Sequence, residues 1–532
     1  MTNGELEPPL EPDSEPAELT DTVVRGAGLA GAGYIVGQVL TLGFFVVLAR
    51  LATPSDFGDF AAGTLLINIG LLFTESGMLA ALIHRKDRID EAASTATVAT
   101  ILGGLALSLG ALAASPVIGT IFHSSRVGEV AAASSGLLLL RTLLVVPEAL
   151  LQRRFSFLRR MIIEPAGVLM FGASAVVLTA NGLGVWGLVL GYYVSGIGDV
   201  ILSWALLRWR PRLKLASVAM WRELVRYGRW GIAANALQNA EQQVPVFLLG
   251  RFSGVGQLGQ FRYAARMEST AGAIVVQAAA YVLFPALARI TENRDRFRDA
   301  CLRSLRSMAM IGFPMGLILV PLGVPAAVLA FGDVWKDAGY AAMALTGVTV
   351  AGTMISFASE MLKADGRPDI LTRIRVVTLV AAVAFMLVLL PFDLVGICGG
   401  LSIGTAIGAG YAVFMVGRQL EIPERRLVEA MLPAAGAALF MAAVLTPLEF
   451  LLVKASSHGT ALGLVLLAAE AALGLVLYLL ALRLLGAETY RELLSLVRRL
   501  LRRGGSEPDD GDQAGQAPGS EAAEASTGAT VP

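Results

Sequence analysis

The chain has 532 residues, of which 55% are hydrophobic and only 16% charged, and its 42 Lys and Arg residues balance 42 Asp and Glu residues. This composition, with a mean hydropathy of +0.67, excludes a soluble globular protein, in which about 25% of residues are charged. The zero net charge argues against a nucleic-acid partner. The dispersed cysteines and histidines predict neither a disulfide framework nor a metal site.

Apolar runs of about twenty residues recur along the chain, and each is long enough to cross roughly 30 Å of hydrocarbon. Delimited by charges, prolines and glycines, these runs predict an all-α polytopic membrane protein of about 14 transmembrane helices. We expect two six-helix bundles plus two C-terminal helices. The predicted spans are 26–49, 57–83, 92–115, 130–151, 162–182, 184–207, 229–250, 261–288, 304–330, 338–362, 369–391, 394–417, 428–453 and 459–484.

The distribution of positive charge supports this division of the chain. Of the 42 Lys and Arg residues, 33 lie in the even-numbered connections and the C-terminal tail, whereas 7 lie at the odd-numbered connections and the adjoining helix ends. Cytoplasmic loops of membrane proteins carry the excess of Lys and Arg. The even side and both termini are therefore predicted to be cytoplasmic, in the cytoplasmic membrane of a bacterium.

The predicted domains follow from these spans. The first twenty residues are acidic and polar, without the basic start of a cleavable signal peptide, so the first helix is expected to remain as a span. Residues 209–228 contain Trp221, Val225 and Tyr227 among basic residues and predict an amphipathic helix at the inner membrane surface. The expected units are a disordered tail (1–24), an N-terminal bundle (25–208), this linker (209–228), a C-terminal bundle (229–418), two further helices (419–486) and a cytoplasmic tail (487–532) that is disordered from about residue 504.

A short internal repeat relates the two bundles. Residues Arg50–Phe60 (RLATPSDFGDF) and Arg251–Phe261 (RFSGVGQLGQF) align at a single offset of 201, which pairs Gly58 with Gly259. Both segments join the first and second helices of their bundles on the predicted outer side. Such a parallel repeat predicts a symmetry axis along the membrane normal, with a central cleft and alternating access.

Several segments, in order, resemble the polysaccharide-repeat flippases (Wzx-type) of the multidrug/oligosaccharidyl-lipid/polysaccharide exporter superfamily. This resemblance implies movement of an undecaprenyl-diphosphate-linked oligosaccharide from the inner to the outer leaflet. Many relatives carry an acid where this chain has Pro245, and the nearest acid here is Glu241, so ion coupling through this helix is not implied. The segments are ARLATPSDFGDFA (49–61), ESGMLAALIHRKDRIDEAASTA (75–96), LLQRRFSFLRR (150–160), GVWGLVLG (184–191), LGQFRYAARM (258–267) and VLFPALARI (282–290).

Helix 229–250 is the least apolar span and supplies the first candidate site. Amides recur at helical spacing, so they share one face, which we expect to line a wet cavity or to bind neighbouring helices. Amides and the carbonyl freed by Pro245 suit sugar hydroxyls, and Pro245 is expected to kink the helix. The polar residues are Asn235, Gln238, Asn239 and Gln242, with Glu241 and Gln243 beside them.

Three arginines are candidates for a diphosphate group, because guanidinium binds phosphate oxygens through two parallel hydrogen bonds. Arg141 lies too deep in span 130–151 to reach the surface, and its alternative role is a structural ion pair with Glu148 or Glu75. Arg262 and Arg266 lie one turn apart near the outer end of span 261–288. Arg262 could instead extend to the interface, and Arg266 could pair with the next acid along the helix.

Acids inside the spans are candidates for carrying a coupling proton or for structural ion pairs. Glu75 and Asp199 lie within the repeated bundles, whereas Glu470 lies in the last helix and is therefore discounted. The sequence Gly26–Gly31 spells a dinucleotide-binding fingerprint, but no strand precedes it, so its glycines are interpreted as close-packing positions.

These patterns favour a non-enzymatic flippase that requires no cofactor, with an amide face for sugar, arginines for diphosphate and the lipid tail in the bilayer. Its partners would be the lipid-linked oligosaccharide, membrane lipids and, in addition, polysaccharide polymerase or export proteins. Two alternatives remain open. One is a multidrug exporter of the same superfamily, and the other is a non-transporting scaffold of a polysaccharide synthesis complex.

Overall fold

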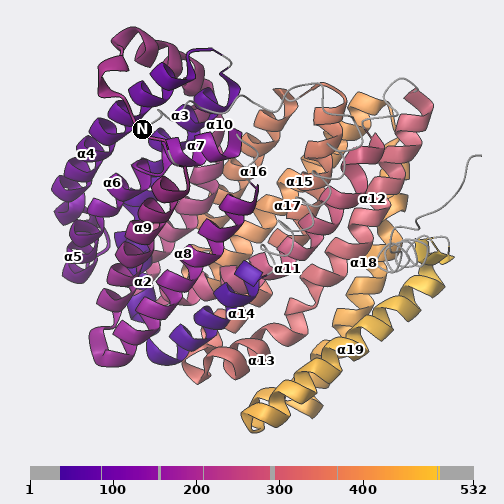
Figure 1. Cartoon of the computed structure of the whole chain (residues 1–532). Coiled ribbons are helices and arrows are strands. Elements are labelled where there is room, and N and C mark those ends of the chain that lie inside the picture. Colours follow the sequence, from indigo (N-terminus) through magenta and orange to yellow (C-terminus); the bar gives the residue numbers. More distant parts are fainter. Residues whose placement is uncertain are drawn as a thin grey trace, which may run out of the picture.

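The described part of the chain is built from helices (Figure 1). A computed structural model describes residues 36–491 apart from 86, 154–156, 208, 288–293, 368 and 488. Within these residues the regular structure consists of α-helices and short 3₁₀ and π turns, and no strand occurs. The expected all-α class is therefore confirmed. Backbone groups in hydrocarbon must be satisfied within the segment, which is why apolar spans adopt helices.

Many helices are long and apolar enough to cross a membrane. Eight described helical segments meet this criterion, or up to eleven if each bent pair is one span. The helices α10 and α11 have comparable lengths of 31 and 33 residues. Large apolar side chains such as Leu452 and Leu484 are 76% and 86% exposed, as expected of a surface that faces lipid. The chain is thus a polytopic membrane protein, while the count of fourteen stays a prediction.

The first half begins with helix Val36–Leu51, which is followed by a sharp bend of 118°. Among its remaining helices, α8 pairs with α9 and α4 with α5, whereas α2 and α3 pack mainly on the second half. They are α2 (Pro54–Gly63), α3 (Leu65–His84), α4 (Ile89–Ile121), α5 (Ser125–Ser134), α6 (Gly136–Thr142), α7 (Val145–Arg153), α8 (Phe157–Leu178), η1 (Thr179–Leu183) and α9 (Val185–Leu207).

The second half repeats this plan and adds two helices at its far edge. Helices α16 and α17 form an extensive pair, and α18 packs on α12 and α19. The elements are η2 (Leu213–Leu215), α10 (Val218–Leu248), η3 (Leu249–Ser253), α11 (Val255–Leu287), α12 (Arg294–Leu317), α13 (Leu319–Phe331), η4 (Asp333–Trp335), α14 (Lys336–Ala344), α15 (Thr346–Ala364), α16 (Asp369–Val388), η5 (Leu390–Phe392), α17 (Asp393–Leu420), α18 (Glu424–Pro447), η6 (Leu448–Val453), η7 (Ala455–Ser457) and α19 (Thr460–Leu485).

Several predicted helices differ from single straight rods. Segment 218–228 does not form a separate helix, because it continues into span 229–250 as one helix, α10. The same helix runs through Pro245 to Leu248. Span 304–330 divides into α12 and α13, which meet at 48°. Pro314 cannot donate to the carbonyl of Met310, and the Tyr478 hydroxyl from α19 donates to that carbonyl at 2.8 Å instead.

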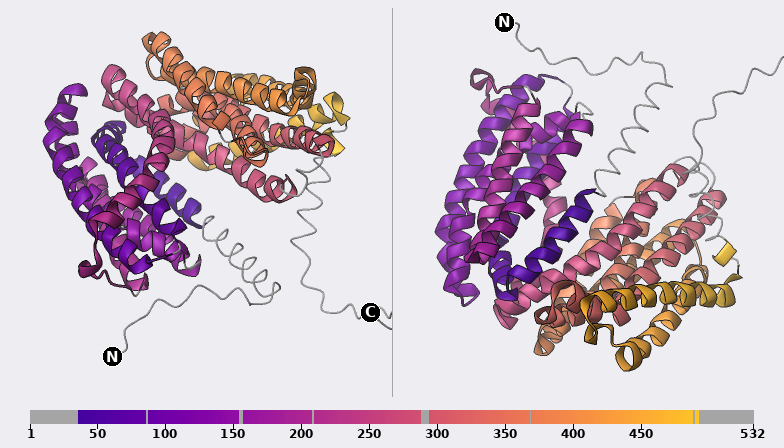
Figure 2. Two further views of the ribbon diagram at one scale, coloured as in Figure 1. Left: turned by 90° about the horizontal axis from the view of Figure 1, so that it is seen from above. Right: turned by 60° about the horizontal axis from the view of Figure 1, so that its bottom comes forward.

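The two halves exchange contacts through their first helices. Helix α10, which opens the second half, packs along α3 of the first half, and α2 packs against α11. Helix Val36–Leu51 lies between the two groups of helices (Figure 2) and bonds to the second half: its Phe45 and Ala49 carbonyls accept hydrogen bonds from Tyr263 and Trp335. The repeat relation thus corresponds to a reciprocal exchange of contacts between the halves.

Candidate functional site

The two halves meet at the predicted outer end through a pair of glycines. A side chain at Gly58 of α2 would overlap the carbonyl oxygen of Val255, and one at Gly259 of α11 would overlap the carbonyl oxygen of Pro54. The offset of 201 converts each contact into the other, because it pairs Gly58 with Gly259 and Pro54 with Val255. The repeat recognised in the sequence therefore forms a self-complementary seam, in which only glycine lets the two backbones approach so closely.

Two arginines related by the same offset fasten this seam. Arg50 donates to the carbonyls of Leu329 and Ala330 at 2.6 and 3.1 Å, at the C-terminal end of α13. Arg251 lies 2.9 Å from the His123 ring, just after the C-terminal end of α4. The C-terminus of a helix carries partial negative charge, which attracts a guanidinium. An arginine of each half thus binds at the C-terminal end of a helix in the other half, Arg50 at α13 and Arg251 at α4.

Aromatic side chains fill the seam beneath these arginines. Tyr263 and Trp335 are fully buried, and their rings lie 3.8 Å apart between centroids. Phe45 stacks on Tyr263 at 3.9 Å, and Phe57 meets the same ring edge-on at 4.9 Å. Such rings bury a large apolar area. The predicted outer end is therefore a dry, packed contact.

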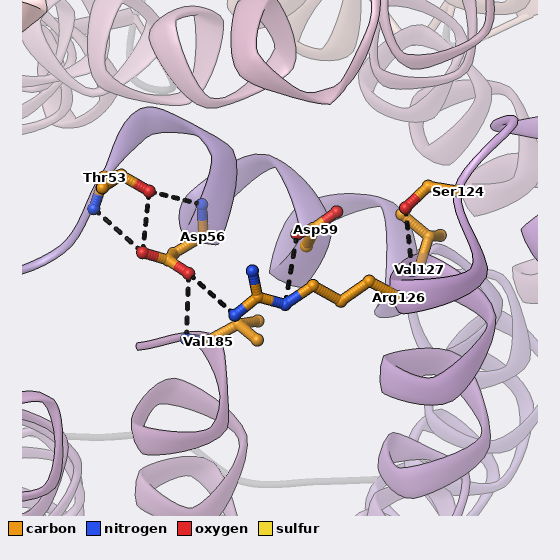
Figure 3. A network of polar contacts seen from close by, with 7 residues as sticks. All are labelled: Thr53, Asp56, Asp59, Ser124, Arg126, Val127 and Val185. Carbon is orange, nitrogen blue, oxygen red and sulfur yellow. Dashed lines mark hydrogen bonds and ion pairs between the residues drawn. The ribbon is translucent and has the colours of Figure 1, made fainter. Parts of the chain in front are cut away.

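Within the first half, a carboxylate network ties three helices together at the same end (Figure 3). The sequence Thr53-Pro54-Ser55-Asp56 forms a capping box at the start of α2, in which the Thr53 hydroxyl accepts from the Asp56 amide. The Oδ2 atom of Asp56 accepts hydrogen bonds from Thr53. Its Oδ1 atom accepts hydrogen bonds from the Val185 amide at 3.2 Å and from Arg126 at 3.3 Å. Asp56 therefore joins the starts of α2, α5 and α9.

The second half has a neutral counterpart of this network. Gln260 aligns with Asp59 at the offset of 201, and Asp59 lies 3.7 Å from Arg126. Gln260 donates to the Val334 carbonyl at 2.6 Å and accepts from the Ala338 amide at 2.9 Å, at the start of α14. The same helix position thus anchors a later helix of its own half, α5 by charge in the first half and α14 by an amide in the second.

Arg141 and Arg262, from opposite halves, both interact with Tyr192 of α9. Arg141 donates to the Tyr192 hydroxyl at 3.2 Å, and its guanidinium lies 5.3 Å from the ring centroid. Arg262, from the second half, lies within electrostatic range of the same tyrosine and is exposed. A cation over an aromatic face is attracted by the ring. Tyr192, which the sequence did not single out, is thus one partner of Arg141.

Asp199 lies close to this cluster. Its Oδ2 atom accepts a hydrogen bond from Ser195 at 3.4 Å, whereas its buried Oδ1 atom receives none from the described donors. Arg141 lies near enough to attract the Asp199 carboxylate electrostatically. The absence of a side chain at Gly167 makes room for the carboxylate. Arg141 and Asp199 therefore belong to one polar group inside the first half.

Arg266 and the acid that follows it have separate partners. Arg266 is half-buried and donates to Gln38 of the first helix at 3.0 Å. Glu268 accepts a hydrogen bond from Thr349 of α15 at 2.8 Å. Arg266 thus links the first helix to α11 across the two halves.

The amide face of α10 is divided between open and bonded side chains. Asn235, Gln238 and Gln242 are exposed. Asn239 donates to the Asn68 carbonyl of α3 at 3.1 Å, as the helix-binding alternative expects. Glu241 forms an ion pair at 3.2 Å with Arg375 of α16, a partner that lay too far along the chain to be anticipated.

The predicted acid Glu75 lies in α3. Its side chain is outside the part of the chain that the structure describes. Residues that sequence reasoning missed are Gln38, Tyr192 and Arg375. The residue type of each gives no sign of a role in the site, and only its contact with Arg141, Arg266 or Glu241 identifies it.

The fold is that of a helical membrane protein whose two halves exchange contacts through their first helices. Residues 47–340 match the family described as Polysaccharide biosynthesis protein. The chain belongs to this family, which confirms the resemblance recognised in its sequence.

Named relatives and solved structures agree with this assignment. The chain is 26% identical over 386 residues to the succinoglycan biosynthesis transport protein ExoT of Rhizobium meliloti (strain 1021), which covers 70% of this chain and 75% of the relative. It is 24% identical over 336 residues to the lipopolysaccharide biosynthesis protein WzxC of Escherichia coli (strain K12), with 60% and 65% covered. The lipid II flippase MurJ in an inward closed conformation has the same fold, with a TM-score of 0.70, 14% identity and coverage of 88% and 99%. An inward-facing multidrug resistance transporter of the MATE family follows with a TM-score of 0.58, 18% identity and coverage of 74% and 99%.

Proposed function

We propose that the protein is a flippase that moves an undecaprenyl-diphosphate-linked oligosaccharide from the inner to the outer leaflet by alternating access. The observation that carries the proposal is the group of arginines that both halves place around Tyr192 and the first helix. Arg141 comes from the first half, and Arg262 and Arg266 come from the second. A diphosphate inside a membrane requires fixed positive charge, and guanidinium supplies it with hydrogen-bond donors in a matching geometry.

The amide face of α10 supports a sugar as the other part of the substrate. Asn235, Gln238 and Gln242 are exposed on a helix that has to cross the membrane. Primary amides both donate and accept hydrogen bonds, as sugar hydroxyls do. An exposed amide face is costly against lipid and is therefore expected to face a wet space.

In this proposal the glycine seam is the gate at the predicted outer end. Gly58 and Gly259 close the predicted outer end by backbone contact, so an outward-open state requires these two helices to separate. The arginines of the seam bind carbonyls and an imidazole rather than a carboxylate. Their contacts are therefore weaker than buried ion pairs and compatible with repeated opening.

The family members named for succinoglycan and lipopolysaccharide biosynthesis support a polysaccharide precursor as the cargo. A lipid-linked precursor would leave its prenyl chain in the bilayer while the headgroup crosses between the halves. The excess of Lys and Arg in the even-numbered connections supports an orientation with both termini on the cytoplasmic side of a bacterial cytoplasmic membrane. A flippase of this kind would act beside polysaccharide polymerase or export proteins.

Replacing Arg141 or Arg266 by Ala is expected to lower the flipping rate at least about tenfold each. Hydrogen bonds to charged groups contribute about 1.5–3 kcal/mol, and each 1.4 kcal/mol corresponds to a factor of about ten. The measurement uses the purified protein in liposomes with a prenyl-diphosphate oligosaccharide. Arrival of the sugar in the far leaflet is detected with a membrane-impermeant lectin.

The matched control is Arg425→Ala, which removes an exposed arginine paired with Glu429. It should flip at the wild-type rate. A prenyl-monophosphate oligosaccharide should show a smaller loss in the arginine variants than the diphosphate. Full activity of both arginine variants would contradict the diphosphate role. Export of cationic drugs without any flipping would favour the multidrug alternative, and no movement of either would favour the scaffold.

A further inference from the structure

Two buried carboxyl groups face each other in the last two helices, outside the repeated halves. Glu449 lies in η6 at the end of α18 and is 3% exposed. Glu470 lies near the middle of α19 and is 4% exposed. Leu445, one turn before Glu449, packs on Gly474, one turn after Glu470. The antiparallel packing of α18 on α19 therefore places the two carboxyl groups opposite each other. Around them, α19 packs on Leu445 of α18, on Ile318 between α12 and α13, and on Leu329 of α13, so the surroundings are apolar.

The hydrogen bonds of this pair are incomplete in a specific way. Both oxygens of Glu449 accept from one donor, the Ala455 amide, at 3.0 and 3.1 Å. Both oxygens of Glu470 are buried, and none of the described donors bonds to them. Two carboxylates are acceptors only. The contact between them can become a hydrogen bond only if one of them carries a proton.

The elements around the pair offer no compensating cation within the described residues. Lys454 and His458 lie in the adjoining connection, but both are exposed, and neither forms a described ion pair with the two acids. Helix α13 carries no charged residue, and Tyr478 of α19 is bonded to Met310. Glu470 lies eight residues before Tyr478 in α19, which is about 12 Å along the helix. Arg306 of α12 lies one turn before Met310, the partner of Tyr478, on the side away from Glu470.

We propose that Glu449 and Glu470 form a proton-binding site in which one proton is shared between the two carboxyl groups. Two ionised carboxylates side by side in apolar surroundings would cost far more than a bound proton, since isolated buried charges are neutralised rather than kept. The shared proton supplies the missing hydrogen bond and joins the end of α18 to α19.

The site is connected to the seam between the halves through a short chain of contacts. Gly463 of α19 packs against Leu329 of α13, and the Leu329 carbonyl accepts the hydrogen bond of Arg50. Loss of the shared proton separates α18 and α19 by charge repulsion. The proton therefore stabilises the packing of α19 on the helix that Arg50 grips.

The test compares the thermal stability of the full-length protein, in lipid nanodiscs, with that of Glu470→Gln between pH 5 and 9. Unfolding releases the proton wherever the folded pair still holds it, because carboxyl groups of an unfolded chain are ionised above about pH 5. The contribution of the pair to stability is therefore present at low pH and is lost as pH rises, until the folded pair itself gives up the proton. Glu470→Gln needs no proton. Its melting temperature should rise relative to wild type by roughly 1 °C or more for each pH unit.

Glu429→Gln is the matched control, because it removes an exposed carboxylate from α18, and it should follow the wild-type curve. In a second measurement, the infrared carbonyl band of a protonated carboxyl group at neutral pH should be present in wild type and missing in Glu470→Gln. If that variant does not fold, Glu449→Gln takes its place, since the amide oxygen still accepts from Ala455. Parallel pH curves for wild type and variant, or no band, would overturn the proposal. Recovery of the wild type at high pH by sodium but not by choline would do so as well, in favour of a metal cation.

Discussion

Replacing Gly58 by Ala will keep the predicted outer end of the protein from closing and will reduce transport by about 5–150-fold. A methyl group there overlaps the Val255 carbonyl, which belongs to backbone and cannot rotate away. Overpacking of a tight contact costs about 1–3 kcal/mol, and a bias of this size between two states is a factor of about 5–150. Gly259→Ala should behave in the same way, because the repeat makes the two contacts equivalent.

The state of the seam can be measured with spin labels on the predicted outer ends of α2 and α11. The distance distribution should shift to longer values in Gly58→Ala and Gly259→Ala. Gly256→Ala is the matched control in the same turn of α11, since a methyl group there meets only the Ser55 hydroxyl at 3.6 Å. Wild-type distances and transport in both seam variants would rule out a closed seam as a working state.

Replacing Asp56 by Ala will destabilise the first half by about 2–4 kcal/mol. The carboxylate is 8% exposed and accepts hydrogen bonds from Thr53, Val185 and Arg126. Its removal takes away the capping box of α2 and leaves the buried Val185 amide without an acceptor, whereas Arg126 is half-exposed and keeps Asp59. A lost cap costs about 1 kcal/mol, and an unsatisfied buried donor costs about 1–3 kcal/mol. The effect should appear as a lower melting temperature of the purified protein and less protein in the membrane.

Asp56→Asn separates the charge from the hydrogen bonds. The amide oxygen can still accept from Val185 and Arg126, so the loss should be smaller than for Asp56→Ala. Asp295→Ala is the exposed control, because its contact with Arg298 lies at the surface, with the Asp side chain 89% exposed, and such pairs contribute about 0–1 kcal/mol. Equal melting temperatures for Asp56→Ala and Asp295→Ala would show that the network is not structural.

The two predictions concern one end of the molecule but different events. The Asp56 network lies inside the first half and holds α2, α5 and α9 as a unit. The glycine seam lies between the halves. A rigid unit beside a closely fitted seam is the arrangement that lets halves move as bodies, because packed interiors have discrete arrangements rather than a continuum.

Fold class could be read from the sequence because hydrocarbon imposes it. Every membrane span must form its backbone hydrogen bonds within itself, so the length of an apolar run and the charges that flank it predict the helices. The breaks within spans were harder to anticipate. The bend after α12 depends on Pro314 together with Tyr478, which lies more than 160 residues away and replaces the lost donor.

Residue type alone predicted part of the candidate site, and the contacts in the structure added the residues that bind to it. A buried Arg or an amide-rich face is conspicuous because burial of a polar group is costly, and this identified Arg141, Arg266 and the face of α10. Tyr192 and Gln38 carry no charge, and Arg375 is partly exposed near the start of α16, so the importance of these residues lies in what they touch. Glu470 was discounted for its position in the chain, yet its facing acid Glu449 makes it a candidate site of its own.

The sequence by itself determined that this chain is a helical membrane protein with a repeat at offset 201, because hydrophobic length, charge and similarity are properties of residues in order. It also determined that Gly58 and Gly259 are equivalent. Only the tertiary structure decided that the two glycines touch, each against the backbone that precedes the other. Equivalence is a relation along the chain, whereas contact depends on how the two halves are placed, and close backbone packing across the seam fixes that placement.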